Sequence, residues 1–189
     1  MVMDAWVLIV IAVAAIVGLA AIVLWSARRR RQRRELREWF GPEYDRSVES
    51  ARSRQRAEGE LAGRTDRRRE LEIRLLTQTA RDRYAAQWNE LQGRFVDRPQ
   101  VAVVEADELI TQVMADRGYP VDDFESKSEL VSVDHPDVVQ NYRDAHGIST
   151  KTTTGEASTE DLRRAVIAYR ALFEELVTDG DRSDDHARS

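Results

Sequence analysis

An unbroken apolar run of 21 residues, Ala5 to Trp25, constrains this chain more than any other feature of its sequence. At about 1.5 Å per residue, a helix of that length reaches roughly 32 Å, close to the roughly 30 Å hydrocarbon core of a bilayer. The run therefore predicts one transmembrane helix, with residues 1–27 forming a short N-terminal tail and the span.

Six arginines follow the run almost directly, whereas the other flank offers only the acidic Asp4. Because arginine beside a span stays on the cytoplasmic side, we expect a single-pass cell-membrane protein with its N-terminus outside and its C-terminal domain cytoplasmic. The cluster should also attract anionic lipid headgroups, and as a topology signal it needs no nucleic-acid partner. The membrane-orienting residues are Arg28, Arg29, Arg30, Arg31, Arg33 and Arg34.

A cleaved signal peptide, followed by an exported or cell-envelope domain, is the alternative. Such a signal needs a basic start, an apolar stretch of about 7 to 15 residues and a small-residue cleavage site. Here no Lys or Arg precedes the run, the run is longer, and no Ala-x-Ala pattern precedes the arginines. These features favour an uncleaved anchor.

The segment from Glu43 to Gln78 is rich in Arg and Glu, poor in apolar residues and free of proline. This composition predicts a long helix, so residues 28–78 should form a basic juxtamembrane segment and a charged helical stalk. A coiled coil needs a sustained apolar seam, but Arg64 and Arg68 fall on the seam that this segment offers. The stalk allows a weak homodimer without requiring one.

Apolar residues recur with helical spacing from Leu75 onward. They predict helices that contain Trp88, that run from Pro99 to Gly118, and that run from Pro136 to Gly147. The clearest stripe follows Ser158, which we expect to cap a helix through Leu176.

No alternating strand pattern occurs, so we expect an all-α fold: a bundle of three or four helices over residues 79–178. The remaining residues, 179–189, are polar and acidic and should form a disordered tail.

Four short segments are distinctive: Phe40-Gly41-Pro42-Glu43-Tyr44, Phe95-Val96-Asp97-x-Pro99, Arg117-Gly118-Tyr119-Pro120 and Ser132-Val133-Asp134-His135-Pro136. They resemble segments of a bacterial family of uncharacterised, membrane-anchored proteins, some of them labelled only as secreted. The similarity covers roughly residues 38–176. It implies membrane anchoring and carries no activity, cofactor or catalytic residue.

Residues that could perform chemistry are few. The chain has no cysteine, which excludes disulfides and thiolate chemistry, and it has no glycine-rich phosphate loop. Asp122, Asp123 and Glu125 could bind Mg²⁺ or Ca²⁺, but their spacing suits a solvated helix N-terminus better. His135, between Asp134 and a proline, is typical of helix capping. We therefore expect no catalytic, metal or cofactor site.

These observations favour a non-enzymatic adaptor or scaffold that binds an unidentified protein partner. Loop residues between helices are the freest to make contacts, so the expected interaction surface contains Arg117, Asp122, Asp123 and Glu125. A ligand-binding or sensory helical domain at the membrane is the alternative, and an enzyme that uses Asp122, Asp123 or His135 is a third reading.

Overall fold

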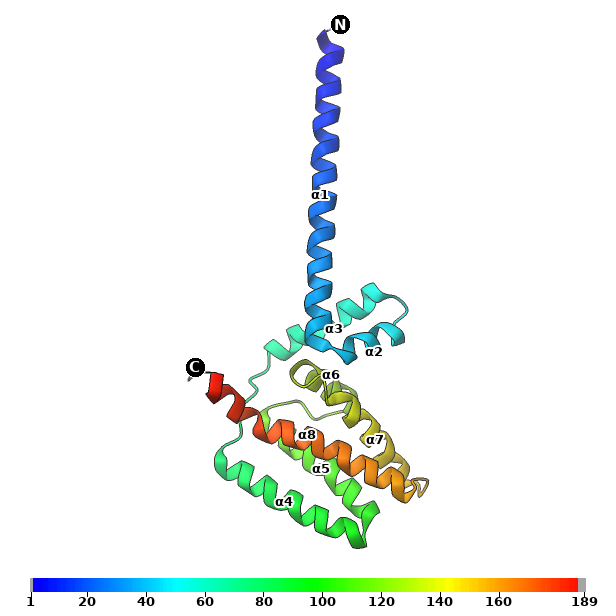
Figure 1. Ribbon diagram of the computed structural model, residues 1–189, viewed down its shortest axis with the longest axis vertical. Coiled ribbons are helices and arrows are strands. Elements are labelled where there is room, and N and C mark those ends of the chain that lie inside the picture. Colours follow the sequence, from blue (N-terminus) through cyan, green and yellow to red (C-terminus); the bar gives the residue numbers. More distant parts are fainter. Residues whose placement is uncertain (1, 187–189) are drawn as a thin grey trace. The chain divides into compact units, whose positions relative to one another are not determined.

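The computed structural model describes the backbone of residues 2–186 and the side chains of residues 16–178. Over residues 2–186 the regular elements are helices and none is a strand, which confirms the expected all-α fold (Figure 1). The chain divides into two compact units, Met1–Trp39 and Phe40–Ser189. The helices are α1 (Val2–Phe40), α2 (Pro42–Ser50), α3 (Arg54–Arg69), α4 (Gln78–Asp97), α5 (Pro99–Arg117), α6 (Phe124–Asp134), α7 (Val139–Thr153) and α8 (Thr159–His186).

The first unit is a single continuous helix, because α1 runs from Val2 through the arginine cluster. Its large apolar side chains between Ile16 and Trp25 are 57–67% exposed. The guanidinium carbon of Arg29 lies 5.2 Å from the centre of the Trp25 ring, within the range of a cation–π contact.

The membrane span expected from Ala5 to Trp25 lies partly outside the residues whose side chains are described. Within the described part of the chain, no helix combines the length and the apolar character that crossing a bilayer requires.

The expected single helical stalk is wrong, because residues 43–78 form two helices and an extended segment. α2 ends at Ser50, and α3 begins after Ser53, whose hydroxyl accepts a hydrogen bond from the Arg56 backbone N–H at 3.3 Å. Ala57, Leu61 and Arg64 form one buried face of α3, which packs against α2 and α6. Of the two arginines on the suggested coiled-coil seam, Arg64 is therefore buried within the second unit and Arg68 is partly buried.

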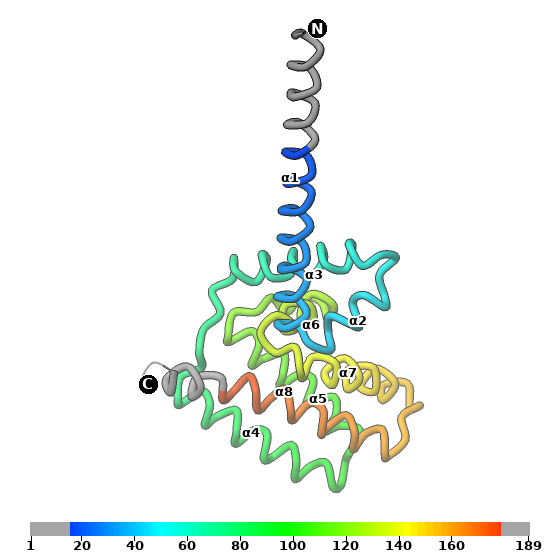
Figure 2. The backbone as a smooth tube through the Cα atoms, turned by 45° about the horizontal axis from the view of Figure 1, so that its top comes forward, coloured from blue at the N-terminus to red at the C-terminus, as the bar shows by residue number. Residues whose placement is uncertain are grey.

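Buried side chains of α4, α5, α6, α7 and α8 form the core of the second unit. Figure 2 shows how these helices are arranged. α8 packs against α5 and α7, and α4 packs against α5. The apolar stripes expected on these helices are buried, and the rings of Trp88 and Phe173 stack with their centres 4.8 Å apart. Ser158 caps α8 as expected, since its hydroxyl accepts the Asp161 N–H at 3.2 Å.

One helical boundary and one element differ from the apolar pattern. α7 continues through Gly147 to Thr153, and α6 is a helix that the apolar pattern did not predict, although Asp123 caps it as the expected helix N-terminus at Asp122 to Glu125 requires. The expected tail, residues 179–189, overlaps the last turns of α8, while residues 187–189 lie outside those described.

Gly118 ends α5 at a point where the backbone of another segment passes very close. Its φ of 94° is left-handed, and the next N–H, that of Tyr119, donates to the Met114 carbonyl at 3.0 Å. The Arg74 N–H donates to the Arg117 carbonyl at 2.8 Å, which brings residues 71–77 across this turn. A Cβ on Gly118 would lie 2.7 Å from the carbonyl oxygen of Glu72.

Gly118→Ala should therefore lower the free energy of unfolding by about 1–3 kcal/mol, through backbone strain and this close approach. Gly93→Ala is the matched control, because Gly93 is inside α4 with no atom within 4 Å of the added Cβ, and it should stabilise by about 0.5–1 kcal/mol. Urea unfolding of the detergent-solubilised full chain, followed by circular dichroism, measures both. Equal midpoints for Gly118→Ala and the wild type would contradict the argument.

Candidate functional site: a buried ion-pair network beside an acidic cleft

The carboxylate of Glu43 is held inside the second unit by two buried arginines. Arg143 donates to both of its oxygens, at 2.6 Å and 2.9 Å, and Arg64 donates to Oε1 at 2.9 Å. All three side chains are buried: Glu43 is 2% exposed, Arg143 is 9% exposed and Arg64 is 7% exposed. Charge-assisted bonds of this kind are strong, and the two-pronged geometry fixes the orientation of the partners.

Local sequence places Glu43 at this point. Gly41, with a φ of 47°, separates α1 from α2, and Pro42 takes the first position of α2, where its missing N–H costs nothing. Glu43 then lies in the first turn, where the helix dipole favours a negative charge. Phe40 and Tyr44 are also buried, so the first distinctive segment of the sequence packs into the second unit.

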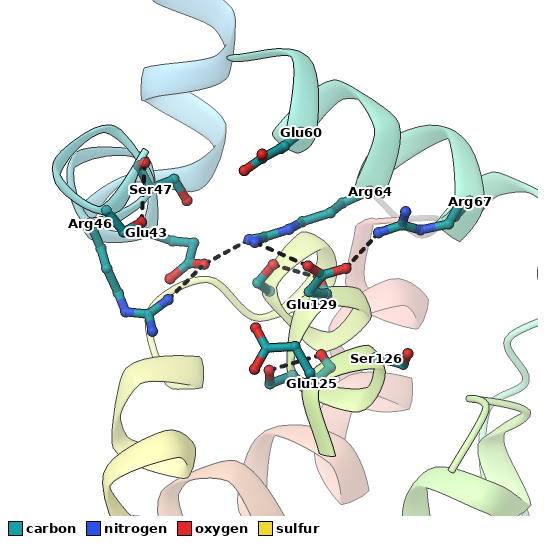
Figure 3. Close-up of polar contacts among 12 residues, drawn as sticks. Glu43, Arg46, Ser47, Glu60, Arg64, Arg67, Glu125, Ser126 and Glu129 are labelled. Atoms are coloured by element: carbon teal, nitrogen blue, oxygen red, sulfur yellow. Dashed lines mark hydrogen bonds and ion pairs between the residues drawn. The ribbon is translucent and has the colours of Figure 1, made fainter. Parts of the chain in front are cut away.

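The network extends from Glu43 to the surface of α3 and α6 (Figure 3). Arg64 also approaches Glu129 at 3.4 Å, and Glu129 accepts a hydrogen bond from Arg67 at 2.5 Å. Arg46 lies 3.7 Å from Glu43. Residues from α2, α3, α6 and α7 are thereby joined through two carboxylates.

A cleft of about 390 Å³ opens beside the outer end of this network. Its apolar lining comes from Leu71, Pro120 and Leu130, and it shares Arg67 and Glu129 with the network. Acidic side chains outnumber basic ones around it, since the charged lining residues are Arg67, Glu70, Asp122 and Glu129.

The structure brings part of the expected interaction surface to this cleft. Asp122 lines it, and Asp123 and Glu125 lie at the start of α6 beside it. The Asp123 carboxylate accepts the Ser126 N–H at 2.8 Å, and this hydrogen bond holds the pKa of Asp123 below its usual range.

Arg117 lies elsewhere and is 2% exposed. Its guanidinium donates to the Leu176 carbonyl at 3.0 Å and to the Arg74 carbonyl at 3.4 Å. Arg117 therefore joins α5, α8 and the segment that follows α3, and it presents no surface for a partner.

Two other distinctive segments meet at Asp134, which accepts hydrogen bonds from Tyr119 and Arg68. Burial and the negative charge of Asp134 raise the pKa of Tyr119 above its ordinary value, so its hydroxyl stays protonated as a donor. His135 follows directly and is 5% exposed, and its backbone N–H donates to the Val131 carbonyl at 2.8 Å. These residues therefore close the end of α6.

A second polar cluster lies between α5, α6 and α7. His146 Nδ1 is 3.2 Å from Asp107, and the His146 ring stacks on Phe124 with centres 3.7 Å apart. Burial raises the pKa of Asp107, but the interactions with His146, Tyr169 and Lys127 together outweigh burial and hold that pKa below its ordinary value. Lys127, itself buried, donates to Thr111 at 3.0 Å.

Sequence reasoning missed both groups of contacts. The sequence gives no sign that His146 has a partner, because Asp107 lies 39 residues earlier in the chain. The only sequence signal for the Glu43 network was the placement of Arg64 on the same helical face as Ala57 and Leu61. Within the described residues, no cluster of three His, Asp or Glu side chains could hold a metal ion.

Comparison with known proteins adds no relative. No protein-family model matches this chain, and neither a curated protein nor a solved structure does. The resemblance based on the four distinctive segments stays a prediction, and the function has to be argued from the geometry.

Glu43→Gln should lower the free energy of unfolding by about 3–5 kcal/mol, because it leaves the buried Arg143 without a carboxylate and Arg64 with only Glu129, at 3.4 Å. Glu60→Gln is the control: Glu60 pairs with Arg56 at 3.0 Å, but both side chains are about half exposed or more, so its loss should cost less than about 1 kcal/mol. Urea midpoints of the detergent-solubilised full chain measure the difference. If the two variants unfold at the same urea concentration, Glu43 does not hold the unit together.

Proposed function

We propose that this chain is a single-pass membrane protein whose helical domain acts as a non-enzymatic adaptor that docks a basic segment of a partner protein. The observation that carries the proposal is the acidic cleft, whose wall is fixed by the buried Glu43 network. The anchor and the cleft are supported by separate observations and can fail separately.

The anchor is supported by the apolar run and by its exposure. Large apolar side chains from Ile16 to Trp25 are more than half exposed on α1, and such a stretch is stable in water only when something apolar covers it. The arginines that follow directly, from Arg28 onward, favour the orientation with the C-terminal domain in the cytoplasm. An exported domain is the alternative that the same run allows.

Docking in the cleft is supported by its chemistry. Apolar side chains from three segments form its lining, and the rim carries Glu70 and Asp122, both exposed. A partner segment with apolar and basic residues would bury the first and pair with the second, as interfaces with a polar rim do. The acidic side chains disfavour nucleic acid at this position, because phosphates would be repelled.

The orientation can be measured with C-terminal reporters that are active on only one side of the membrane, together with the mass of the mature chain. We expect a cytoplasmic signal at full mass. An external signal, or the loss of about 27 residues, would move the domain to the cell envelope and refute the uncleaved, N-outside anchor.

The cleft can be tested by reversing its charge. The double variant Glu70→Arg, Asp122→Arg should reduce the partner recovered by crosslinking and co-purification of the full chain about tenfold or more, because like charges would face each other. The control is Asp97→Arg, Glu108→Arg, which makes the same charge change at exposed positions outside the cleft lining. Equal recovery with both double variants would exclude the cleft as the docking site.

A further inference from the structure

A second groove lies between α7 and α8, away from the residues that line the acidic cleft. Its volume is about 310 Å³, and small side chains form much of its lining: Ala145, Ala168 and Ala171. Ile148 adds a partly buried apolar surface. Ile167, on α8, lines the same groove and is 63% exposed.

This one surface supplies both features that a helix–helix contact needs: a projecting apolar side chain and a space that can receive one. Ile167 is a large apolar side chain that projects into solvent, and the alanines leave room for a side chain of that size. A groove that carries its own complementary side chain suits an isologous contact, in which the same patch of two copies faces itself.

The charges at the rims of the groove are also self-complementary. Arg164 lines the groove from α8, where it also pairs with Asp161, and Asp144 lines it from α7; both Arg164 and Asp144 are exposed. A two-fold axis along the groove would place α8 of one copy over α7 of the other. Each Arg164 would then face the Asp144 of the second copy, so that two opposite-charge pairs flank the apolar contact.

We propose that the α7–α8 groove is the surface through which two copies of this chain associate. The occupant is a second copy because one surface supplies the projecting Ile167, the alanine-lined space and both signs of charge. The contact is short, so the dimer should be weak. This inference depends on neither the anchor nor the acidic cleft.

Charge exchange between copies tests the proposal directly. Asp144→Arg places two arginines opposite each other in a homodimer, and Arg164→Asp places two aspartates opposite each other, so each variant alone should dimerise about tenfold or more weakly than the wild type. Mixed together, the two variants again form two Arg–Asp pairs, and the mixture should dimerise like the wild type. Sedimentation of the detergent-solubilised full chain over a range of concentrations measures all three.

Two further variants separate the groove from other causes. Arg163→Asp is the control, because Arg163 is an exposed neighbour that pairs with Glu160 within α8 and lies outside the groove lining, and it should leave the dimer unchanged. Ile167→Ser removes the projecting side chain at an exposed position and should weaken the dimer about tenfold without affecting the fold. A monomeric wild type, single charge variants that dimerise normally, or a mixture that stays monomeric would each overturn the proposal.

Discussion

Taking the carboxylate of Glu43 out of water costs several kcal/mol, and the fold of the second unit depends on how that cost is met. Arg143 and Arg64 supply three hydrogen bonds to its two oxygens, and each arginine comes from a different helix. An apolar contact persists when the side chains shift slightly, whereas a buried carboxylate loses its hydrogen bonds to the two arginines. The relative positions of α2, α3 and α7 are therefore set more strictly than the burial of Leu61 or Phe40 would set them.

The same network determines what the neighbouring surface can do. Glu129 is bound by Arg64 on its inner side and by Arg67 on its outer side, so a cleft residue is held in place from the core. A binding surface with a fixed wall loses less conformational entropy when a partner docks. In the proposed adaptor role, docking a partner would not require these side chains to become ordered, so less of the interaction free energy would be lost.

The sequence predicted the helical class and the apolar faces of α4, α5 and α8, because helical periodicity is a local signal. The prediction of a solvated helical stalk for residues 43–78, which was based on their high density of Arg and Glu, was wrong. Hydropathy treats Arg64 as a surface residue and has no means of showing that Glu43 neutralises it. No sequence pattern indicated the cleft: of the expected interaction surface only Asp122 lines it, and Arg117, expected on that surface, is buried. Contacts such as Asp107 with His146 depend on how distant helices meet and leave no trace in spacing.

The bond between Glu43 and Arg143 joins positions 100 residues apart, and this separation has a consequence for synthesis. While the chain grows from the ribosome, α2 and α3 emerge long before α7 is synthesised. Glu43 and Arg64 therefore stay exposed to solvent until Arg143 is available. Non-local contacts of this kind are slow to form, and the domain can complete itself only after most of it has been translated. If the proposed membrane anchor is correct, its apolar run leaves the ribosome before this domain can fold, so insertion of the anchor would precede folding.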